Sequence, residues 1–261
     1  MNGKPTVIST FAGCGGSSLG YQWAGFNELL AIEWEKNAVE TFKLNFPNIP
    51  IWQKDITKVK GKDILKFLKL KKGELDVLDG SPPKVFVMEN VPGMVRGKMK
   101  GRFKEIIIAL KETGYNVKCK LMNARNYKVP QSRQRLIFIG VKNGIPLYTT
   151  PSKNIITSKD CIEYLEETEK INRKHITPGL KEYAKKLKYG EAASKYHPTG
   201  SLFGLCRLHP DKPCPTIIKS AGTGLLHYKY NLDFLSVKEL KLLSSFPEDF
   251  VFQEGIMVSG T

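Results

Sequence analysis

The stretch LDGSPPKVFVMENVPG, from Leu78 to Gly93, decides how the fold is to be interpreted. Two apolar runs, Leu75–Leu78 and Val85–Met88, each have the composition of a buried β-strand, yet only a few residues separate them. Two neighbouring parallel strands need a crossover of roughly a dozen residues or more. Either the two strands are antiparallel, or a segment of the protein is missing between Pro83 and Lys84.

Strands and helices alternate on both sides of this stretch, which predicts an α/β fold with a doubly wound sheet. The first βαβ unit consists of a strand at Val7–Phe11, a glycine-rich turn, a helix to about Ala24 and a strand at Leu29–Ile32. We also expect a hairpin-like pair of strands that closes the sheet. These strands and the remaining helices are expected at Asn116–Asn123 and Arg135–Val141, and at Asn37–Leu44, Asp63–Leu70 and Phe103–Thr113.

The character of the sequence changes at about Ile145. A Lys-rich helical stretch, Glu163–Lys188, is interrupted by Thr177-Pro178-Gly179 and leads into a Gly-rich segment, Gly200–Gly224. This composition predicts a second, smaller and less regular domain. Near its end, Ser236-Val237-Lys238-Glu239 has the pattern of a capping box, which begins a short helix.

Composition limits the class of protein. The chain has 261 residues, 41% of them hydrophobic and 25% charged, which is enough for a sizeable core. It has no apolar run of about 20 residues and no signal-peptide pattern, so we expect a cytoplasmic protein. The five cysteines are scattered without metal-ligand spacing, which predicts reduced thiols and no metal site. A net charge of +16 favours a polyanionic partner such as nucleic acid, although lysine excess alone is the alternative explanation.

The glycine-rich turn STFAGCGGSSLG suggests a ligand site. Gly13, Gly15 and Gly16 lie between a predicted strand and a predicted helix, where a ligand can approach the backbone and the free N–H groups of the helix. Ser18 stands where the GxGxxG pattern has its third glycine, so pyrophosphate is not the obvious ligand. A tight structural turn is the alternative.

Glu33 and Trp34 strengthen the ligand interpretation. Glu33 ends the second predicted strand, where a carboxylate can accept hydrogen bonds from two ribose hydroxyls. Trp34 can stack on a purine. An acid at this position after a glycine turn favours a nucleoside ligand over a solvated helix cap.

The motifs resemble those of cytosine-C5 DNA methyltransferases in their order along the chain. FAGCGG, Glu33-Trp34, Asp55-Ile56, GSPP, ENV and QSRQR follow one another, and the similarity continues through KPCPTI and LSVKELKLLSSFPEDF. The resemblance implies a Rossmann-like, S-adenosylmethionine-dependent methyltransferase domain in residues 1–145. It also implies a small target-recognition domain in residues 146–250, and a remnant, residues 251–261, of a C-terminal segment that returns to the large domain.

The resemblance implies S-adenosylmethionine as the cofactor, S-adenosylhomocysteine as its product, and no metal. Glu33 would bind the ribose, Trp34 would lie against the adenine, and Asp55 with Ile56 would lie at the adenine edge. The residues expected to bind the cofactor are Phe11, Gly13, Gly15, Gly16, Glu33, Trp34, Asp55, Ile56 and Pro82.

The same resemblance places a catalytic cysteine directly after Pro82-Pro83, where this sequence has Lys84. In the family, that cysteine attacks C6 of cytosine and is followed by a loop over the DNA and a helix that leads to the next parallel strand. Cys14 lies inside the cofactor turn and is badly placed to replace it. We therefore predict that a real segment is missing between Pro83 and Lys84; a natural deletion is the alternative.

The remaining catalytic residues are also implied by the resemblance. Glu89 would hold a proton on N3 of cytosine, and burial would raise its pKa toward the useful range. Alternation along one strand would place Gln131, Arg133 and Arg135 on the same face. The expected catalytic residues are Glu89, Arg133 and Arg135, and the expected substrate-binding residues are Asn90, Gln131, Arg207 and Thr216.

The sequence thus predicts a DNA (cytosine-5-)-methyltransferase that acts on a flipped-out cytosine in duplex DNA, of the kind found in prokaryotic or phage restriction-modification. We expect a monomer that is associated with the nucleoid through DNA and has no membrane partner. A tRNA-directed cytosine-C5 methyltransferase and an inactive DNA-binding homologue are the alternatives, although no Cys-Phe-Thr tripeptide of the tRNA-directed branch is present. The recognition sequence and the existence of a cognate restriction endonuclease stay open.

Overall fold

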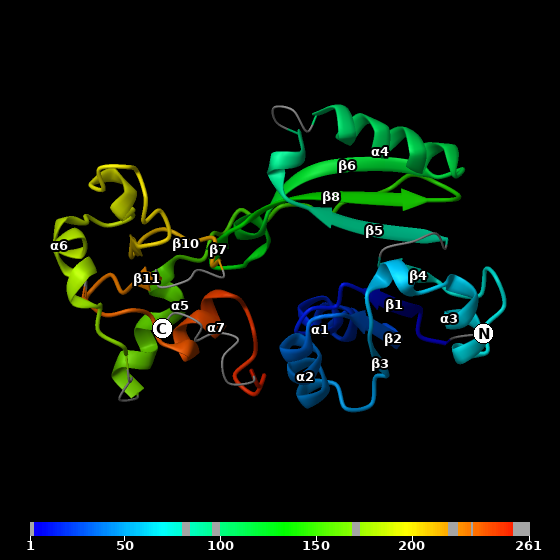
Figure 1. Cartoon of the computed structure of the whole chain (residues 1–261), viewed down its shortest axis with the longest axis horizontal. Coiled ribbons are helices and arrows are strands. Elements are labelled where there is room, and N and C mark those ends of the chain that lie inside the picture. The colour runs from blue at the N-terminus through cyan, green and yellow to red at the C-terminus, as the bar shows by residue number, and fades with distance from the viewer. Residues whose placement is uncertain are drawn as a thin grey trace. The chain divides into compact units, whose positions relative to one another are not determined.

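The computed structural model describes residues 3–79, 84–95, 100–168, 173–218, 224–230 and 232–252. These residues divide into two compact units, shown in Figure 1. Unit 1 contains the chain up to Met122, the segment Gln134–Thr149, and Val251 with Phe252. Unit 2 contains Asn123–Arg133 and Thr150–Phe250. Because the chain passes repeatedly between the units, the sequence does not divide at a single boundary near residue 145.

Unit 1 is built on a seven-stranded sheet with the order β3-β2-β1-β4-β5-β8-β6. The strands β1 to β5 are parallel, and β8 runs antiparallel to β5. The strand order reverses beside β1, so the sheet is doubly wound, which confirms the predicted fold class. The strands are β1 (Thr6–Thr10), β2 (Asn27–Glu33), β3 (Ile51–Gln53), β4 (Val77–Asp79), β5 (Val85–Asn90), β6 (Asn116–Asn123) and β8 (Gln134–Val141).

Helices pack against this sheet through apolar side chains. Ile64 of α3 packs with Ile8 and Leu30, while Phe103 of α4 packs with Phe86 and Phe138. Leu78 and Phe86, which contact these two clusters, are register partners and share one face of the sheet, so α3 and α4 cover that face. The helices are α1 (Gly16–Trp23), α2 (Lys36–Asn45), α3 (Gly61–Leu68) and α4 (Lys100–Glu112).

The pairing of β4 with β5 bears on the question raised by the sequence. The two strands are parallel, with Val77 opposite Val85 and Leu78 opposite Phe86. The antiparallel alternative is therefore wrong. Residues 80–83, including Pro82, lie outside the described part of the chain, and the missing segment stays a prediction.

Unit 2 is less regular. Its helices are α5 (Ser158–Thr168), α6 (Pro178–Lys186) and α7 (Val237–Leu243), and its strands are only two residues long. The predicted capping box is confirmed, since Ser236 and Glu239 exchange side chain to backbone hydrogen bonds at the start of α7. Glu239 is fully buried and forms an ion pair with Arg173, with 2.8 Å between Nη2 and Oε1. Strands β7 (Gln131–Ser132), β9 (Cys206–Arg207), β10 (Cys214–Pro215) and β11 (Leu225–Leu226) form two small parallel pairs.

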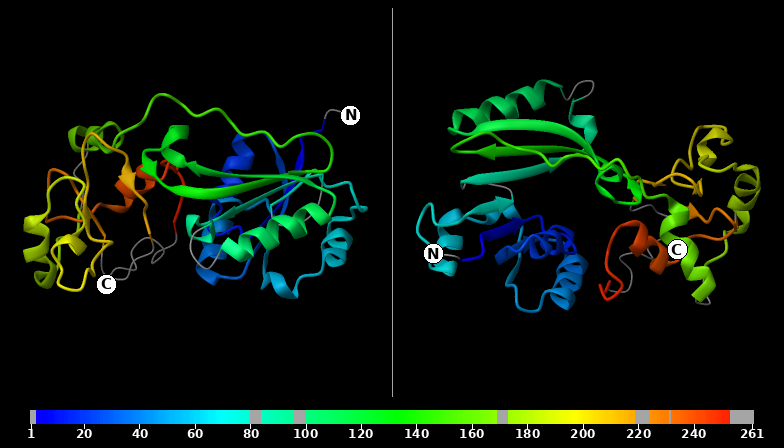
Figure 2. Two further views of the ribbon diagram at one scale, coloured as in Figure 1. Left: turned by 90° about the horizontal axis from the view of Figure 1, so that it is seen from above. Right: turned by 180° about the vertical axis from the view of Figure 1, so that it is seen from behind.

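The sheet of unit 1 has two chemically different ends. We call the end at which β1 to β5 finish the carboxyl end, and the end at which they begin the amino end. Because β8 is antiparallel, it finishes at the amino end, and its arrowhead points there in Figure 1 and in the right view of Figure 2. Functional sites of doubly wound sheets lie outside the carboxyl end.

Candidate active site

The glycine-rich turn lies at the carboxyl end, between β1 and α1. Gly13 and Gly15 have positive φ angles of 55° and 96°, and Gly15 caps α1. A Cβ at Gly15 would lie 2.3 Å from a ring carbon of Phe46, so only glycine fits there. A Cβ at Gly13 would meet nothing within 4 Å. The turn is thus packed tightly on one side and open at Gly13, where a ligand can reach the backbone.

Glu33, at the end of β2, shapes this turn. Its Oε2 accepts a hydrogen bond from the Gly13 N–H at 2.8 Å, and its Oε1 accepts from Trp34 and Glu35 at 2.8 and 3.0 Å. The residue is 7% exposed, so it is not a solvated helix cap. A carboxylate has about four acceptor positions, which leaves Glu33 with capacity for a ligand hydroxyl.

Two aromatic rings stand beside Glu33 at the carboxyl end. Phe11 and Trp34 are 68% and 69% exposed, and Phe11 has a positive φ of 57°. Such exposed rings at the ends of adjacent strands offer flat apolar surface to a base. The chemistry of this set, a buried acid with acceptor capacity and two exposed rings at adjacent strand ends, fits a nucleoside.

The other residues predicted at the cofactor site occupy neighbouring positions. Asp55 follows β3 and caps a short 3₁₀-helix, η1 (Ile56–Lys58), by accepting hydrogen bonds from Thr57. These bonds lower the pKa of Asp55. Ile56 packs at the border of the apolar cluster under β2, and Gly16 is the first residue of α1.

Glu89 and Arg135 meet on neighbouring strands at the carboxyl end. Glu89 of β5 forms an ion pair with Arg135 of β8, and their side chains are 51% and 20% exposed. Arg135 also donates from Nη1 to the carbonyl of Gln134 at 2.8 Å. Asn90 accepts a hydrogen bond from the Val91 N–H and shapes the chain after β5. An acid held by an arginine at a strand end can bind a polar ring edge.

The structure contradicts the prediction that Gln131, Arg133 and Arg135 share one face of one strand. Gln131 belongs to β7, whereas Arg135 belongs to β8, and Arg133 lies between the two strands. The physical reason is pairing, since β7 pairs with β10 in unit 2, with Gln131 opposite Cys214. Arg133 donates to the carbonyl of Ile217 at 3.5 Å.

Gln131 and Thr216 join segments within unit 2. Gln131 is 4% exposed, and its side chain accepts from the Ile217 N–H and donates to the Leu243 carbonyl, both at 3.4 Å. Thr216 donates to the Ser132 carbonyl at 2.9 Å. These contacts bring QSRQR and KPCPTI together, which sequence spacing alone did not predict.

Arg207 is engaged in backbone contacts. Its guanidinium donates twice to the Tyr228 carbonyl, at 2.7 and 3.2 Å, and once to the Leu187 carbonyl at 3.2 Å. It also lies over the ring of Tyr189, 4.5 Å from its centre. This geometry supports a role in holding unit 2 together more directly than a role in substrate contact.

No pattern in the sequence pointed to Asn45, which ties Val251 to α2. Its side chain donates to the Val251 carbonyl at 2.7 Å and accepts from the Val251 N–H at 2.8 Å. Val251 thereby joins unit 1, although the preceding residue belongs to unit 2. An asparagine at a helix end has many possible partners, so only the fold reveals this one.

The four cysteines outside the glycine-rich turn do not suit a nucleophile. Burial raises the pKa of the Cys119, Cys161 and Cys206 thiols to about 11 and raises that of Cys214 as well. These groups therefore stay protonated near neutral pH, whereas the thiolate is the reactive form. Among the described residues, no group of three or more His, Cys, Asp or Glu is arranged to hold a metal ion, and no helix could span a membrane.

A glycine turn tied to a buried acid, on a doubly wound sheet, defines unit 1 as a Rossmann-like domain of the class that binds nucleoside-containing cofactors. The family is given by a direct match. The model of C-5 cytosine-specific DNA methylases matches residues 5–83 and 75–257. The chain belongs to this family, the DNA (cytosine-5-)-methyltransferases, which confirms the family and enzyme class predicted from the motifs.

Individual relatives support the same family assignment. The chain is 30% identical over 336 residues to the type II methyltransferase M.DdeI of Desulfomicrobium norvegicum, covering 95% of this chain and 80% of the relative. It is 30% identical over 297 residues to M1.HphI of Haemophilus parahaemolyticus, covering 95% and 79%. Methylation and restriction-modification are thus the setting of the family members that it resembles.

Solved structures show the same fold. A protein described as a DNA modification methyltransferase encoded within an E. coli prophage aligns with a TM-score of 0.75 and 22% identity, over 95% of this chain and 90% of that one. DNMT2 of Spodoptera frugiperda aligns with a TM-score of 0.68 and 14% identity, over 97% and 92%. At these identities the likeness extends to the fold alone.

The matches also bear on the β4–β5 junction. The alignments with the two relatives run over 336 and 297 positions, although only 95% of this 261-residue chain takes part, so both alignments contain positions for which this chain has no residue. The family model matches in two parts, residues 5–83 and 75–257, which overlap over residues 75–83. The overlap ends at the junction at which the crossover rule requires more chain.

Proposed function

We propose that the protein transfers a methyl group from S-adenosylmethionine to C5 of a flipped-out cytosine in duplex DNA. The observation that carries the proposal is the position of the Glu89–Arg135 pair, which lies at the same carboxyl end of one sheet as the glycine turn and Glu33. One surface of unit 1 therefore offers both a nucleoside site and a polar pair suited to a pyrimidine edge.

The cofactor site is proposed to consist of the turn, Glu33 and the exposed rings. Glu33 would accept a ribose hydroxyl while it keeps the Gly13 N–H in place. Trp34 would cover the adenine, and Asp55 would accept from its edge. S-adenosylmethionine supplies an electrophilic methyl group when bound. Phe11, Gly15, Gly16, Ile56 and Pro82 complete the proposed set.

The cytosine site is proposed at Glu89 and Arg135. Glu89 would hold a proton at N3, which draws electron density from C6, and Arg135 would bind the ring oxygen. Their mutual ion pair would be exchanged for contacts with the base. Removing the base from the duplex costs a few kcal/mol, which contacts with DNA must offset.

The target-recognition domain is proposed in residues 146–250, most of which belong to unit 2, and residues 251–261 are proposed as a remnant that returns to the large domain. Gln131, Arg133 and Thr216 would support the flipped nucleotide through the β7–β10 pair, and Asn90 would shape the chain beside it. Arg207 would act by positioning its segment. We propose that the protein works as a monomer on cytoplasmic, nucleoid DNA.

The nucleophile is proposed to be a cysteine directly after Pro83, in a segment that this sequence lacks. The parallel β4–β5 pair, the two-part family match and the raised pKa values of the Cys119, Cys161, Cys206 and Cys214 thiols support it. If Pro83 is truly joined to Lys84, an inactive DNA-binding homologue is the function that the same site supports. A tRNA substrate would be separated from duplex DNA by comparing methylation of the two.

The test is covalent trapping on duplex DNA that contains 5-fluorocytosine, because fluorine at C5 blocks release of the thiol. Protein from the complete gene should have a mass above 29.4 kDa and should form the adduct, and its Cys→Ser variant should bind DNA without forming it. The chain with Pro83 joined to Lys84 should form none. An adduct of that joined chain at Cys14, or a gene without the extra segment, would contradict the proposed mechanism.

A further inference from the structure

The amino end of the sheet, opposite the candidate active site, collects lysines from segments that are far apart in the sequence. They come from the chain before β1, the loop before β4, the start of β5, the end of α4 and the end of β8. All are exposed. We call the group the amino-end lysines: Lys4, Lys71, Lys72, Lys84, Lys111 and Lys142.

Contacts show that these segments are continuous in space. Thr6, at the start of β1, donates from its backbone N–H and its hydroxyl to Asp76, before β4, at 3.0 Å each. Asp76 forms an ion pair with Lys84 at 3.1 Å. The Lys142 N–H donates to the Lys84 carbonyl at 3.0 Å, and the Lys142 ammonium lies 5.5 Å from the ring centre of Tyr115. The group therefore crosses the sheet from β1 to the start of β6.

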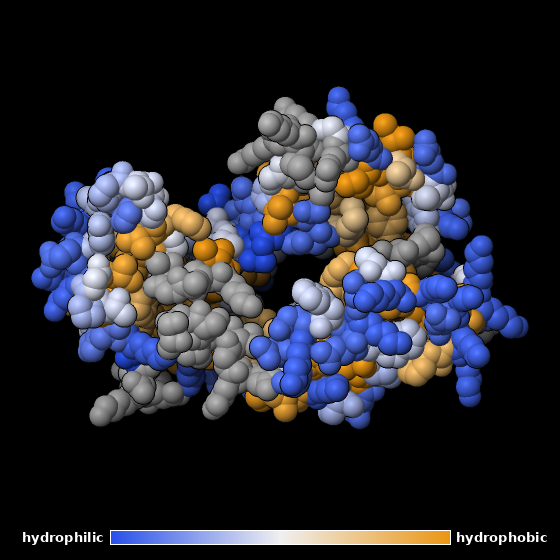
Figure 3. All heavy atoms as spheres, in the orientation of Figure 1, coloured by the Kyte–Doolittle hydropathy of each residue, from blue (hydrophilic) through white to orange (hydrophobic). Residues whose placement is uncertain are grey.

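Most of this charge is not neutralised. Among the described residues, Lys84 is the member of the group that forms an ion pair, and its partner Asp76 also binds Thr6. Two other acids lie in these segments: Glu74 accepts from the Lys71 backbone N–H, and Glu112 follows Lys111 at the end of α4. In the space-filling view of Figure 3, hydrophilic side chains project from this end of unit 1. The unpaired ammonium groups make a surface of positive potential.

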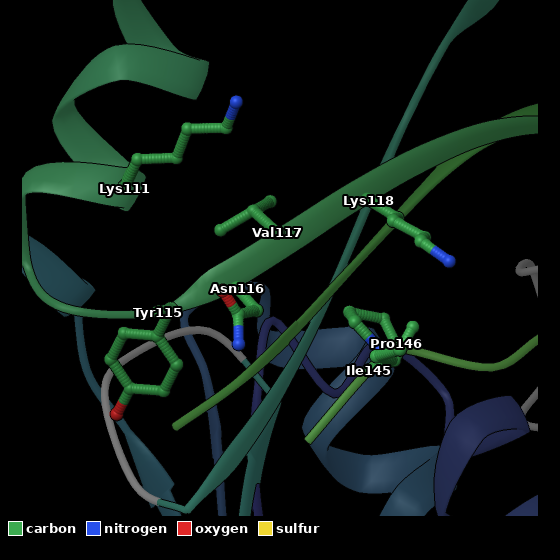
Figure 4. A pocket seen from close by; sticks show the side chains of 7 residues that line it. All are labelled: Lys111, Tyr115, Asn116, Val117, Lys118, Ile145 and Pro146. Carbon is green, nitrogen blue, oxygen red and sulfur yellow. The ribbon is translucent and has the colours of Figure 1, made fainter. Parts of the chain in front are cut away.

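An open hollow lies beside this surface, at Lys111. It has a volume of about 580 Å³ and is bordered by Lys111, Lys118, Asn116 and Ile145. Figure 4 shows the Lys111 and Lys118 side chains extending on different sides of the strand that carries Val117. The basic surface is thus concave where it reaches Lys111, and concavity concentrates the field of the surrounding charges.

Two simpler explanations do not account for the group. Lysines on an edge strand prevent sheets from pairing, which explains Lys118 on β6 but not Lys71, Lys72 or Lys111. The lysines also do not serve to raise the electrostatic potential at the active site, because the two ends of the sheet are too far apart. The five residues of β1 separate the two ends by about 16 Å at about 3.3 Å per residue, beyond a Debye length of about 8 to 10 Å.

We propose that the amino-end lysines bind the phosphate backbone of duplex DNA, as a second DNA-binding surface apart from the site of methylation. Four strand spacings of about 4.8 Å give a row about 19 Å long, which matches five to six phosphates at about 3.4 Å of axis each. The inference rests on the proposed function, because it takes duplex DNA as the partner. The surface holds DNA without reading its sequence.

The experiment compares two triple variants of the full chain. Lys71→Gln, Lys72→Gln and Lys111→Gln together remove three charges at the amino end. The matched control, Lys60→Gln, Lys62→Gln and Lys66→Gln, removes three exposed charges on and next to α3, outside the amino-end group. Affinity for a 5′-labelled duplex is measured by fluorescence anisotropy across a salt series. Protection of individual lysines from acetylation by bound DNA is mapped by mass spectrometry.

The amino-end variant should bind duplex DNA at least roughly tenfold more weakly near physiological salt, with a log–log salt slope smaller by about 0.9 for each lysine that contacts a phosphate. Bound DNA should protect Lys71, Lys72 and Lys142 in the parent. The inference would be overturned if both variants lost the same DNA affinity, or if bound DNA did not protect these lysines from acetylation. It would also be overturned if the amino-end variant lost binding to phosphatidylglycerol vesicles but kept its affinity for DNA.

If the unsubstituted chain binds S-adenosylhomocysteine and DNA, and both variants bind DNA with the same affinity, the second DNA-binding surface is overturned but the proposed function is not. A parent that binds neither would overturn the proposed function as well. Binding of S-adenosylhomocysteine should be the same in the parent and the amino-end variant, because the lysines removed lie at the opposite end of the sheet from the cofactor site.

Discussion

The two ends of the sheet in unit 1 differ in how they are built. The carboxyl end depends on backbone conformations that few residues adopt, with positive φ angles at Phe11, Gly13 and Gly15. The amino end has ordinary strand starts joined by side chains, such as Thr6 to Asp76 and Asp76 to Lys84. The carboxyl end is therefore sensitive to shape, whereas the amino end is sensitive to charge.

The largest expected effect on stability follows from Gly15. Gly15→Ala should lower the free energy of unfolding by about 2 to 4 kcal/mol, because its Cβ would overlap Phe46 at 2.3 Å and the φ angle is positive. Gly13→Ala is the matched control, with the same sign of φ but open space, and should cost about 1 kcal/mol. Urea unfolding measures both. Equal losses would mean that the packing against Phe46 is not what requires glycine.

A smaller effect is expected from Asp76 at the amino end. Hydrogen bonds from Thr6, and then Lys84, lower the pKa of Asp76. A carboxyl whose pKa is lowered by folding stabilises the protein above its unfolded pKa of about 3.9, and this contribution is lost as the pH falls through the folded pKa. Asp76→Asn should therefore cost about 1 to 2 kcal/mol at pH 7 and little near pH 2.

Lys84→Gln is the control for that prediction, since it removes the half-exposed ion pair and leaves the contacts of Asp76 with Thr6. It should cost 0 to about 1 kcal/mol. Unfolding of both variants across a pH series checks the order. A difference between Asp76→Asn and the parent that stays constant from pH 7 to pH 2 would show that the carboxylate charge is not involved.

Local patterns predicted the first half of the fold well. The strands at β1, β2, β5, β6 and β8 and the helices α1 to α4 were expected within a few residues of their observed bounds. In each of these elements the hydrophobic residues recur with the period of a helix or a strand, and no pairing with a distant segment changes the element. The strand β3 was not predicted, because Ile51–Gln53 is too short to show alternation.

Contacts between segments that are far apart in the chain could not be predicted from local sequence patterns. QSRQR has the alternation of one strand, but pairing with Cys214–Pro215 divides it, so Gln131 and Arg135 fall in different units. Arg207 looked like a substrate contact until its guanidinium was found on the carbonyls of Tyr228 and Leu187. Such partners depend on chain paths that no local spacing encodes.

The sequence predicted the positions of candidate site residues best where those residues lie at the end of a strand. Glu33 and the glycine turn lie together, as the βαβ pattern indicated, and Glu89 meets Arg135 because β5 and β8 are neighbours. The sequence did not predict that Glu33 would hold three backbone N–H groups. Backbone donors leave no trace in residue types, so this double use of the acid became visible only in the fold.

The most direct test of the account is calorimetric titration of the chain with S-adenosylhomocysteine and, separately, with NAD. The parent should bind S-adenosylhomocysteine and not NAD. Glu33→Ala should weaken that binding by about a hundredfold, since it removes charge-assisted hydrogen bonds to both the ligand and the Gly13 turn. Heat from NAD with no response to S-adenosylhomocysteine would contradict the assignment of the carboxyl end as a methyl-donor site.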